Sequence, residues 1–209
     1  MATIVFSMVI VHLRSLHITK ALPGQVHWQR PDEGWICLNT DGVVSKLNGF
    51  GSVGGVFRTH DGDWILGFNK SVGITQPLQS ELWAILTGLQ LARDNGYERL
   101  MVQSDNLEAI TRLNASTADS DVNALVRAIT RLRSAGWVTM FRWIPREANK
   151  LADAMAKLEA SYDLSFFVVP PASLQSLIMS GISTLVYWTF RISLIREKKR
   201  HLKCMDHLK

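Results

Sequence analysis

The chain has 209 residues, of which 47% are hydrophobic, and a formal net charge of +5. This length suits one domain of ordinary size with extensions. The basic excess favours nucleic acid or an anionic surface over a cationic partner. The two cysteines, Cys37 and Cys204, lie in a predicted buried strand and in the tail. They argue against a disulfide framework and for a reducing, intracellular compartment, either nuclear or cytoplasmic.

Residues 1–27 are interpreted as an irregular leader. Residues 3–13 are apolar, but no basic region precedes them and no small-residue cleavage site follows closely. A signal peptide is the alternative interpretation of this segment. The folded domain is predicted to cover residues 28–160.

The first half of this domain is typical of an antiparallel meander. Residues 35–41 form an apolar strand that ends at Asp41-Gly42, and residues 49–58 form a glycine-containing second strand. Asp61-Gly62 is a turn of the type that hairpins use, and residues 64–68 form the third strand.

The second half alternates helices and strands. A helix is predicted from Pro77 to Asn95-Gly96, with Glu81 at the border of its apolar face. Apolar residues recur along it at helical spacing: Leu78, Leu82, Ile85, Leu89 and Ala92. Residues 100–103 then form a strand, and Ser104-Asp105-Asn106 opens a helix. A strand followed by a helix predicts parallel pairing with a neighbouring strand.

Three further elements complete the predicted domain. Residues 121–135 form a helix, residues 138–144 form the last strand, and Pro145 ends that strand. The final helix covers residues 147–158 and places Asn149 and Asp153 on one face.

Four acids stand at predicted element ends or seams: Asp41, Glu81, Asp105 and Asp153. If the first and fourth strands are parallel neighbours, Asp41 and Asp105 emerge side by side at their carboxyl ends. Four carboxylates in one cleft repel one another unless a divalent metal binds, and oxygen-only ligands select Mg²⁺ or Mn²⁺ over zinc. Taken singly, each acid has a simpler explanation as a helix cap, a turn residue or a solvated side chain.

Five segments carry a resemblance to a known family: residues 38–42, 54–58 with 61–62, 80–85, 103–106 and 144–153. In this order and at these intervals, the sequence resembles the type 1 ribonuclease H family. It is most similar to the plant reverse-transcriptase-like branch, which derives from retroelements. The resemblance covers roughly residues 28–160.

The resemblance implies a ribonuclease H-like α/β fold with a five-stranded mixed sheet, three strands antiparallel and two parallel, flanked by helices. It also implies an endonuclease that hydrolyses the RNA strand of RNA–DNA hybrids by a two-metal mechanism and leaves 5′-phosphate and 3′-hydroxyl ends. The cofactor would be two Mg²⁺ ions, with Mn²⁺ as the alternative metal. Asp41 would bridge the metals, Glu81 and Asp105 would hold one, and Asp153 the other.

Six residues are predicted to contact the substrate: Gly42, Asn39, Ser80, Asn106, Arg146 and Asn149. Gly42 allows close backbone approach. The four polar side chains contact the minor groove or order the acids, and Asn149 alternatively caps the last helix or supports Asp153. Arg146 contacts a phosphate or is only solvated.

Two departures from the family pattern affect turnover and substrate binding. The loop from Ile144 to Glu147 has no histidine, the residue that the resemblance implies for product release, and the link from Asn114 to Asp121 has no lysine or arginine with which to bind the hybrid. The alternative to an active nuclease is therefore a weak or inactive nucleic-acid-binding module of the same fold.

Residues 161–209 are predicted to be a C-terminal extension with an apolar helix and a basic tail. Residues 174–195 are long enough to span a bilayer, but Gln175 and Arg191 interrupt them. A docking helix or a disordered extension is favoured over membrane association through this segment. The sequence leaves the oligomeric state open.

Overall fold

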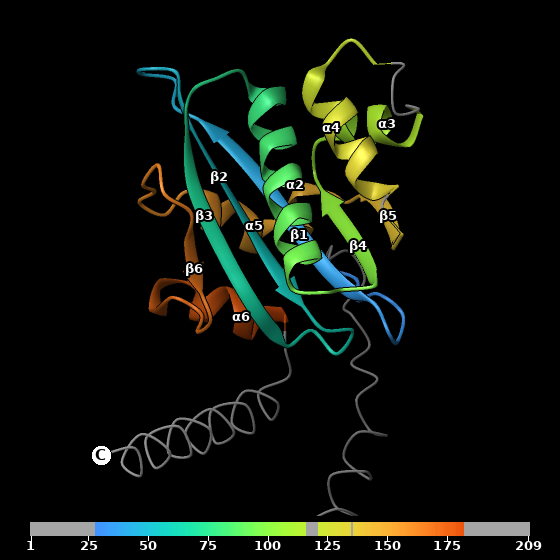
Figure 1. The fold of residues 1–209 in the computed structure, drawn as a ribbon. Helices are drawn as coiled ribbons and strands as arrows, with labels where there is room; N and C mark the ends of the chain where they lie inside the picture. Colours follow the sequence, from blue (N-terminus) through green and yellow to red (C-terminus); the bar gives the residue numbers. More distant parts are fainter. Residues whose placement is uncertain (1–27, 116–120, 135, 182–209) are drawn as a thin grey trace, which may run out of the picture.

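The computed structural model describes residues 28–115, 121–134 and 136–181. A six-stranded mixed sheet forms the centre of this part of the chain, in the order β5-β4-β1-β2-β3-β6 (Figure 1). Its strands are β1 (Ile36–Val44), β2 (Phe50–Arg58), β3 (Trp64–Ile74), β4 (Arg99–Ser104), β5 (Val138–Trp143) and β6 (Ser165–Phe167). β1, β2 and β3 form the antiparallel meander, and β4 and β5 run parallel to β1. The predicted mixed sheet is thus confirmed.

The predicted count of five strands is wrong by one, because β6 extends the sheet. β6 lies in the segment predicted as a C-terminal extension, and it pairs antiparallel with β3. The indole N–H of Trp64 donates to the carbonyl of Phe167 over 3.0 Å and ties this strand down. A strand of three residues is too short to leave a periodic pattern in the sequence.

The first strand also continues past its predicted end at Asp41. β2 keeps pairing with it, from Asp41 opposite Gly54 to Val44 opposite Gly51, so the strand continues to Val44. The parallel pairing with β4 ends earlier, at Asn39 opposite Gln103. Asp41 and Asp105 each lie two residues beyond that last pair, which places them level with each other where the parallel pairing stops.

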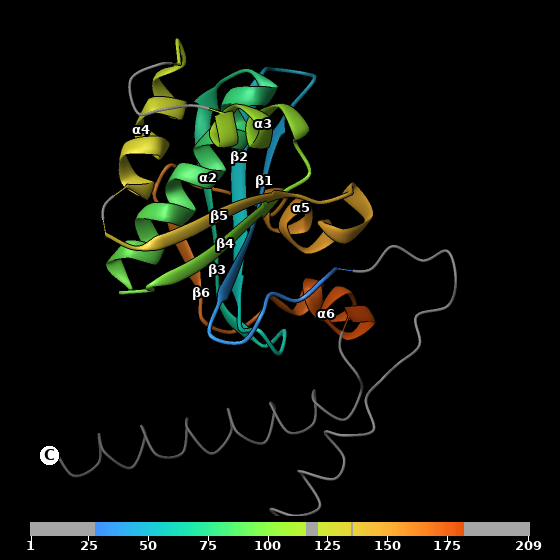
Figure 2. The same cartoon turned by 90° about the vertical axis from the view of Figure 1, so that its right-hand side faces the viewer.

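Helices cover both faces of the sheet (Figure 2). Their bounds are α2 (Pro77–Asp94), α3 (Leu107–Ala115), α4 (Ala124–Arg133), α5 (Lys150–Ala156) and α6 (Gln175–Gly181), with the short 3₁₀ turns η1 (Arg146–Ala148) and η2 (Ala172–Leu174). α2, α3 and α4 lie on one face, and α5 and α6 lie on the other.

The long helix α2 confirms its predicted range and anchors the main core. Pro77 occupies its first turn, where the missing N–H costs nothing. Gly96, with a φ of 71°, follows its end. Its apolar face buries Leu82, Ile85 and Leu89 against the sheet. Because Leu82 faces the sheet, the preceding residue Glu81 lies at the border of this apolar face.

Two helices begin later than predicted. α4 begins at Ala124 and not at residue 121, because the side chain of Asn123 accepts the N–H of Leu125 over 2.9 Å and caps the helix there. α5 begins at Lys150 and not at residue 147, because the chain first forms the 3₁₀ turn η1 after Pro145. Each helix thus begins three residues after its predicted start.

Two glycines let helices approach β1 and β2 closely beside Asp41. A Cβ on Gly42 would collide with the backbone of Ser80 and Glu81 at the start of α2. A Cβ on Gly54, the β2 partner of Asp41, would collide with the backbone of Met155 and Ala156 in α5. The sheet therefore meets both helices at backbone contact distance around the first predicted acid.

Residues 174–195, for which membrane association is the less favoured interpretation, fall mostly outside the described residues. Within the described ranges, no helix is long and apolar enough to cross a bilayer. The described part of the segment consists of the end of η2 and of α6.

Leu174 tests how firmly this C-terminal region belongs to the folding unit. Its side chain is 3% exposed and packs with Val56, Trp64 and Met155. We expect Leu174→Ala to lower the free energy of unfolding by about 2–5 kcal/mol, because truncating a buried leucine leaves a cavity. Denaturant unfolding measures this loss.

The matched control is Val168→Ala, since Val168 is 69% exposed in the same region. It is expected to change the unfolding free energy by less than about 0.5 kcal/mol. Equal, small effects of both variants would show that the domain is stable without this segment. The predicted domain boundary near residue 160 stays a prediction until then.

Candidate active site

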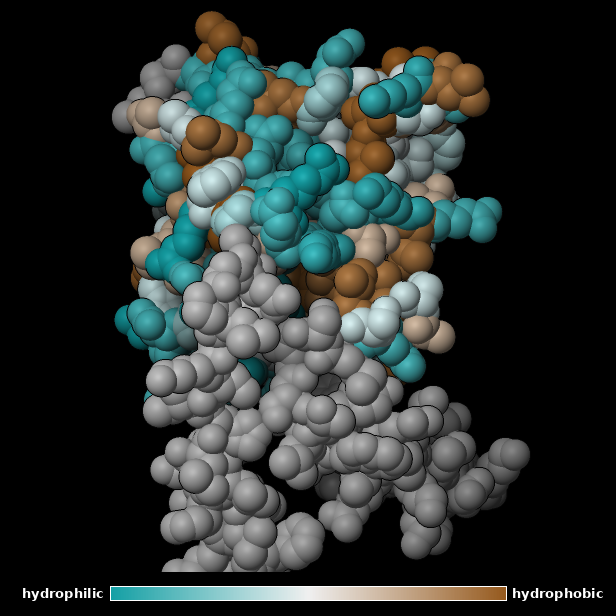
Figure 3. Space-filling model, turned by 180° about the vertical axis from the view of Figure 1, so that it is seen from behind, coloured by the Kyte–Doolittle hydropathy of each residue, from teal (hydrophilic) through white to brown (hydrophobic). Residues whose placement is uncertain are grey.

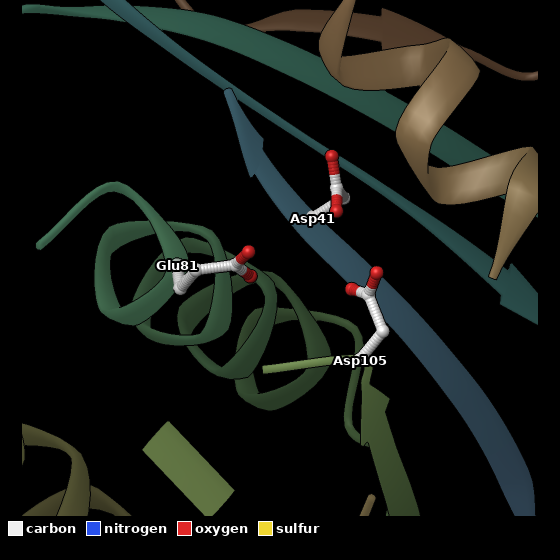
Figure 4. Close-up of side chains that lie close together, drawn as sticks. All are labelled: Asp41, Glu81 and Asp105. Carbon is white, nitrogen blue, oxygen red and sulfur yellow. The ribbon is translucent and has the colours of Figure 1, made fainter. Parts of the chain in front are cut away.

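Three carboxylates from three separate elements point toward one another (Figure 4). Asp41 comes from β1, Glu81 from the second turn of α2, and Asp105 from the residue directly after β4. One oxygen from each lies within 4.8 Å of the others. The structure thus brings together three of the four acids predicted from the sequence.

Burial makes this cluster electrostatically costly. Asp41 is 3% exposed and Glu81 is 8% exposed. Burial and the neighbouring Asp105 and Asp153 raise the pKa of Asp41 to about 7. Burial, Asp41 and Asp105 raise the pKa of Glu81 to about 9. Without a cation, the folded protein therefore resists full ionisation of the cluster.

Two local contacts oppose this rise and orient Glu81. The Ser104 hydroxyl lies 3.4 Å from the Glu81 carboxylate and donates to it. The backbone N–H of Gly42 also donates to Glu81, and both bonds lower the pKa of that carboxyl. The close approach of α2 to Gly42 is what makes the second bond geometrically available.

The cluster fits a divalent metal ion. Oδ2 of Asp41 is buried and has no hydrogen-bond partner among the described residues. A buried carboxylate oxygen without a partner is unfavourable in a folded protein, and a cation supplies the missing interaction. The three ligands are all carboxylates, a donor set that suits hard cations.

The fourth acid, Asp153, lies outside the three-acid group. It belongs to α5, and its charge raises the pKa of Asp41, so it faces the same region. Its carboxylate is held by Lys157 at 2.7 Å and by Arg146 at 3.5 Å. The Lys157 contact was missed in the sequence, although the four-residue spacing from Asp153 on one helix signals it.

Asn149 supports Asp105 and not the side chain of Asp153. Its Nδ2 donates to Oδ1 of Asp105 over 3.1 Å and to the carbonyl of Thr40 over 2.9 Å. It makes no side-chain cap on α5. Of the alternatives predicted for this residue, the structure displays the ordering of an acid.

The other polar side chains predicted to contact the substrate occupy two kinds of position. Asn39 and Ser80 are buried, and Ser80 donates to the carbonyl of Pro77 over 2.8 Å. Asn106 caps α3 by accepting the N–H of Ala109 over 2.9 Å. The direct contact of these residues with a substrate stays a prediction.

Arg146 is an exposed cation at this site. Its side chain is 73% exposed, and its guanidinium lies 3.9 Å from Asp105 as well as 3.5 Å from Asp153. Interactions with Asp153, Asp105 and Asp41 raise its pKa further. The face of the molecule that carries α5 is hydrophilic at its centre (Figure 3).

A family model described as "Reverse transcriptase-like" matches residues 39–159. The chain belongs to the reverse transcriptase-like family. The match covers β1 through α5, and so includes Asp41, Glu81, Asp105 and Asp153.

One similar protein of known sequence comes from Arabidopsis thaliana and is provisionally named a ribonuclease H protein. It is 32% identical over 156 residues, which cover 73% of this chain and 25% of that protein. This member of the reverse transcriptase-like family therefore spans about a quarter of that relative's length.

Solved structures show the same fold. RNase H1 from the halophilic archaeon Halobacterium salinarum NRC-1 matches with a TM-score of 0.51 and 25% identity, covering 58% of this chain and 94% of that one. LC11-RNase H1, solved in complex with an RNA/DNA hybrid, matches with a TM-score of 0.51 and 20% identity, covering 57% of this chain and 92% of that one. The predicted ribonuclease H-like fold is confirmed.

The raised pKa values predict an unusual pH dependence of stability in the absence of metal. In the unfolded chain, Asp41 and Glu81 ionise near pH 4, whereas in the folded chain they do so near pH 7 and pH 9. The folded state therefore holds more protons between these limits, and the free energy of unfolding falls as pH rises. We expect the Tm measured with EDTA to fall from pH 5 to pH 8.

The variant Asp41→Asn is expected to flatten this pH dependence and to raise the metal-free Tm at pH 8. Asp61→Asn is the matched control, because Asp61 is an exposed acid in the β2–β3 turn. It should leave the slope unchanged. A wild-type Tm that stays level or rises from pH 5 to pH 8 would contradict the electrostatic picture.

Proposed function

We propose that this chain is a divalent-metal-dependent endonuclease that hydrolyses the RNA strand of RNA–DNA hybrids. One observation carries the proposal: Asp41, Glu81 and Asp105 converge within 4.8 Å on a ribonuclease H-like fold, with a buried carboxylate oxygen left without a partner. The relatives named as ribonucleases, one of them solved with an RNA/DNA hybrid, support the substrate class.

Mg²⁺ is the metal that we propose, with Mn²⁺ as a substitute. All three carboxylates of the group offer hard oxygen ligands, and no histidine or cysteine belongs to the group. Zinc favours nitrogen and sulfur ligands, so this donor set selects against it. When bound, Mg²⁺ supplies charge neutralisation at the scissile phosphate and lowers the pKa of water.

The residues of the chain have separable roles in this proposal. Asp41, Glu81 and Asp105 would hold the metal, and Oδ2 of Asp41, which has no hydrogen-bond partner among the described residues, is free to bind it. Asp153 completes the site from α5, once its carboxylate is free of the ion pairs with Arg146 and Lys157.

Substrate is held through its backbone and shape and not through its base sequence. A hybrid duplex presents 2′-hydroxyls and phosphates across a wide minor groove. Arg146 is exposed beside the acids and offers a planar donor set to a phosphate. Binding to phosphate would also withdraw its positive charge from Asp153 and Asp105, which leaves these acids to the metal.

Cleavage of a labelled RNA–DNA hybrid tests the function. We expect the wild type to cut the RNA strand with Mg²⁺ and not with EDTA, and to leave the DNA strand intact. Asp41→Asn removes a metal ligand and should abolish cutting, whereas the exposed-acid control Asp61→Asn should cut like the wild type. Failure of a folded wild type to cut any hybrid with Mg²⁺ or Mn²⁺ would favour the inactive nucleic-acid-binding alternative.

Arg146 makes a second, quantitative prediction. If it contacts a phosphate, Arg146→Ala should weaken hybrid binding and reduce the slope of log affinity against log salt by about one. Arg93→Ala is the matched control, since Arg93 lies in the last turn of α2, at the opposite end of that helix from Glu81. Equal salt slopes for the wild type and Arg146→Ala would mean that Arg146 does not bind phosphate.

A further inference from the structure

A buried arginine, Arg58, lies at the end of β2. It is 9% exposed, and among the described residues no carboxylate forms an ion pair with it. Burial lowers its pKa to about 10, so it stays a cation at neutral pH. Its guanidinium stacks on the ring of Trp28 at 3.3 Å and donates to Oδ1 of Asn39. Burial of an unpaired charge costs free energy. We therefore expect Arg58 to have a role beyond packing.

A chain of directed hydrogen bonds leads from Arg58 to the acid cluster. Nδ2 of Asn39 donates to Oδ1 of Asn149 over 3.4 Å. Nδ2 of Asn149 in turn donates to Oδ1 of Asp105 over 3.1 Å. Arg58, Asn39, Asn149 and Asp105 therefore form one relay that joins β2, β1 and the start of α5 to the end of β4.

The direction of this relay follows from the chemistry of its first member. Arginine is a donor only, whereas an asparagine amide has one donor end and one acceptor end. Because Arg58 takes the oxygen end of Asn39, the nitrogen end of Asn39 must face Asn149. The nitrogen end of Asn149 then faces the carboxylate of Asp105 and the carbonyl of Thr40, both of which need a donor there. A reversed Asn149 would set its carbonyl oxygen against that carboxylate.

A second donor-only group joins this buried network. The indole N–H of Trp28 donates to Oε1 of Gln103 over 2.7 Å, and that oxygen also accepts from Nδ2 of Asn39 over 3.0 Å. Gln103 thus accepts from Asn39, but it is not a link in the path to Asp105. This side branch offers a matched control within the same buried network.

We propose that Arg58 is a positioning residue for the metal ligand Asp105, acting through Asn39 and Asn149. The inference rests on the proposed function for the meaning of Asp105 as a ligand. Partners that orient a metal ligand from behind typically contribute 10–100-fold to metal affinity. Arg58 lies two residues further back, so the lower end of that range applies.

Mn²⁺ affinity, measured by electron paramagnetic resonance on the full chain, tests the proposal without reference to cleavage. Arg58→Met keeps an unbranched apolar stem of the side chain and removes every donor. We expect it to weaken Mn²⁺ binding about 10-fold, while Arg58→Lys, which retains a donor, recovers most of the affinity. If Arg58→Met does not fold, Asn39→Ala interrupts the same relay at its next member and should show the same loss.

Trp28→Phe is the control, because it keeps an aromatic ring next to Arg58 and removes the indole donor that bonds to Gln103. It should lower the Tm and leave Mn²⁺ affinity within about twofold of wild type, as expected for a buried bond remote from the ligand. Equal Mn²⁺ affinities of wild type, Trp28→Phe and a folded Arg58→Met or Asn39→Ala would overturn the proposal, whatever their stabilities.

The two proposals fail in different ways. A wild type that binds Mn²⁺ but does not cut a hybrid refutes the nuclease, and the variants still decide the role of Arg58. A wild type that cuts the hybrid, together with unchanged Mn²⁺ affinity in the relay variants, refutes the positioning role alone. A folded wild type without Mn²⁺ affinity overturns both.

Discussion

The mutual repulsion of three buried carboxylates is the constraint on which the rest of this structure depends. Asp41, Glu81 and Asp105 lie within 4.8 Å of one another, and neither burial nor charge favours that arrangement. The surrounding backbone has to impose it. β4 stops pairing with β1 at Asn39, which opens the edge beside Asp41. Gly42 admits α2 close enough for Glu81 to reach the same place. A bound metal ion would relieve this repulsion.

The negative charge of Asp41 lowers the stability of the metal-free fold, but metal binding requires it. An amide in place of Asp41 removes the charge that burial penalises, so it relieves the folded state while it removes a metal ligand. Such sites are expected where a chain is selected for binding and not for maximal stability. The stability lost at the cluster is supplied by the apolar contacts of α2 with β1 and β2, where Leu38, Phe57 and Leu82 are fully buried.

Much of the fold was predictable because its signals are local. The helical repeat of Leu82, Ile85 and Leu89 lies within one segment, and it located α2 correctly. The acids were recognisable because each follows or interrupts an apolar segment. β6 was missed because three residues carry no period, and its register depends on contacts of β3 with residues almost a hundred positions away.

The support of the site was harder to predict, because its partners are distant in sequence. Asn149 bonds to Thr40, 109 positions away, and Arg58 reaches Asn39 across the β1–β2 pair. Each of these polar residues has an ordinary explanation as a cap, a turn or an exposed strand end when it is considered alone. Asp153 shows the same limit: its place on α5 was foreseen, but its ion pair with Arg146 depends on how the chain turns in η1.

The central claim is that Asp41, Glu81 and Asp105 bind a divalent metal ion, with Oδ2 of Asp41 as one of its ligands. The most direct measurement is a crystal structure of the wild-type chain soaked in Mn²⁺, with anomalous diffraction data. The account predicts an anomalous peak that contacts Oδ2 of Asp41 together with carboxylate oxygens of Glu81 and Asp105. A saturating soak that leaves this position without a peak, or places the ion away from Asp41, would contradict it.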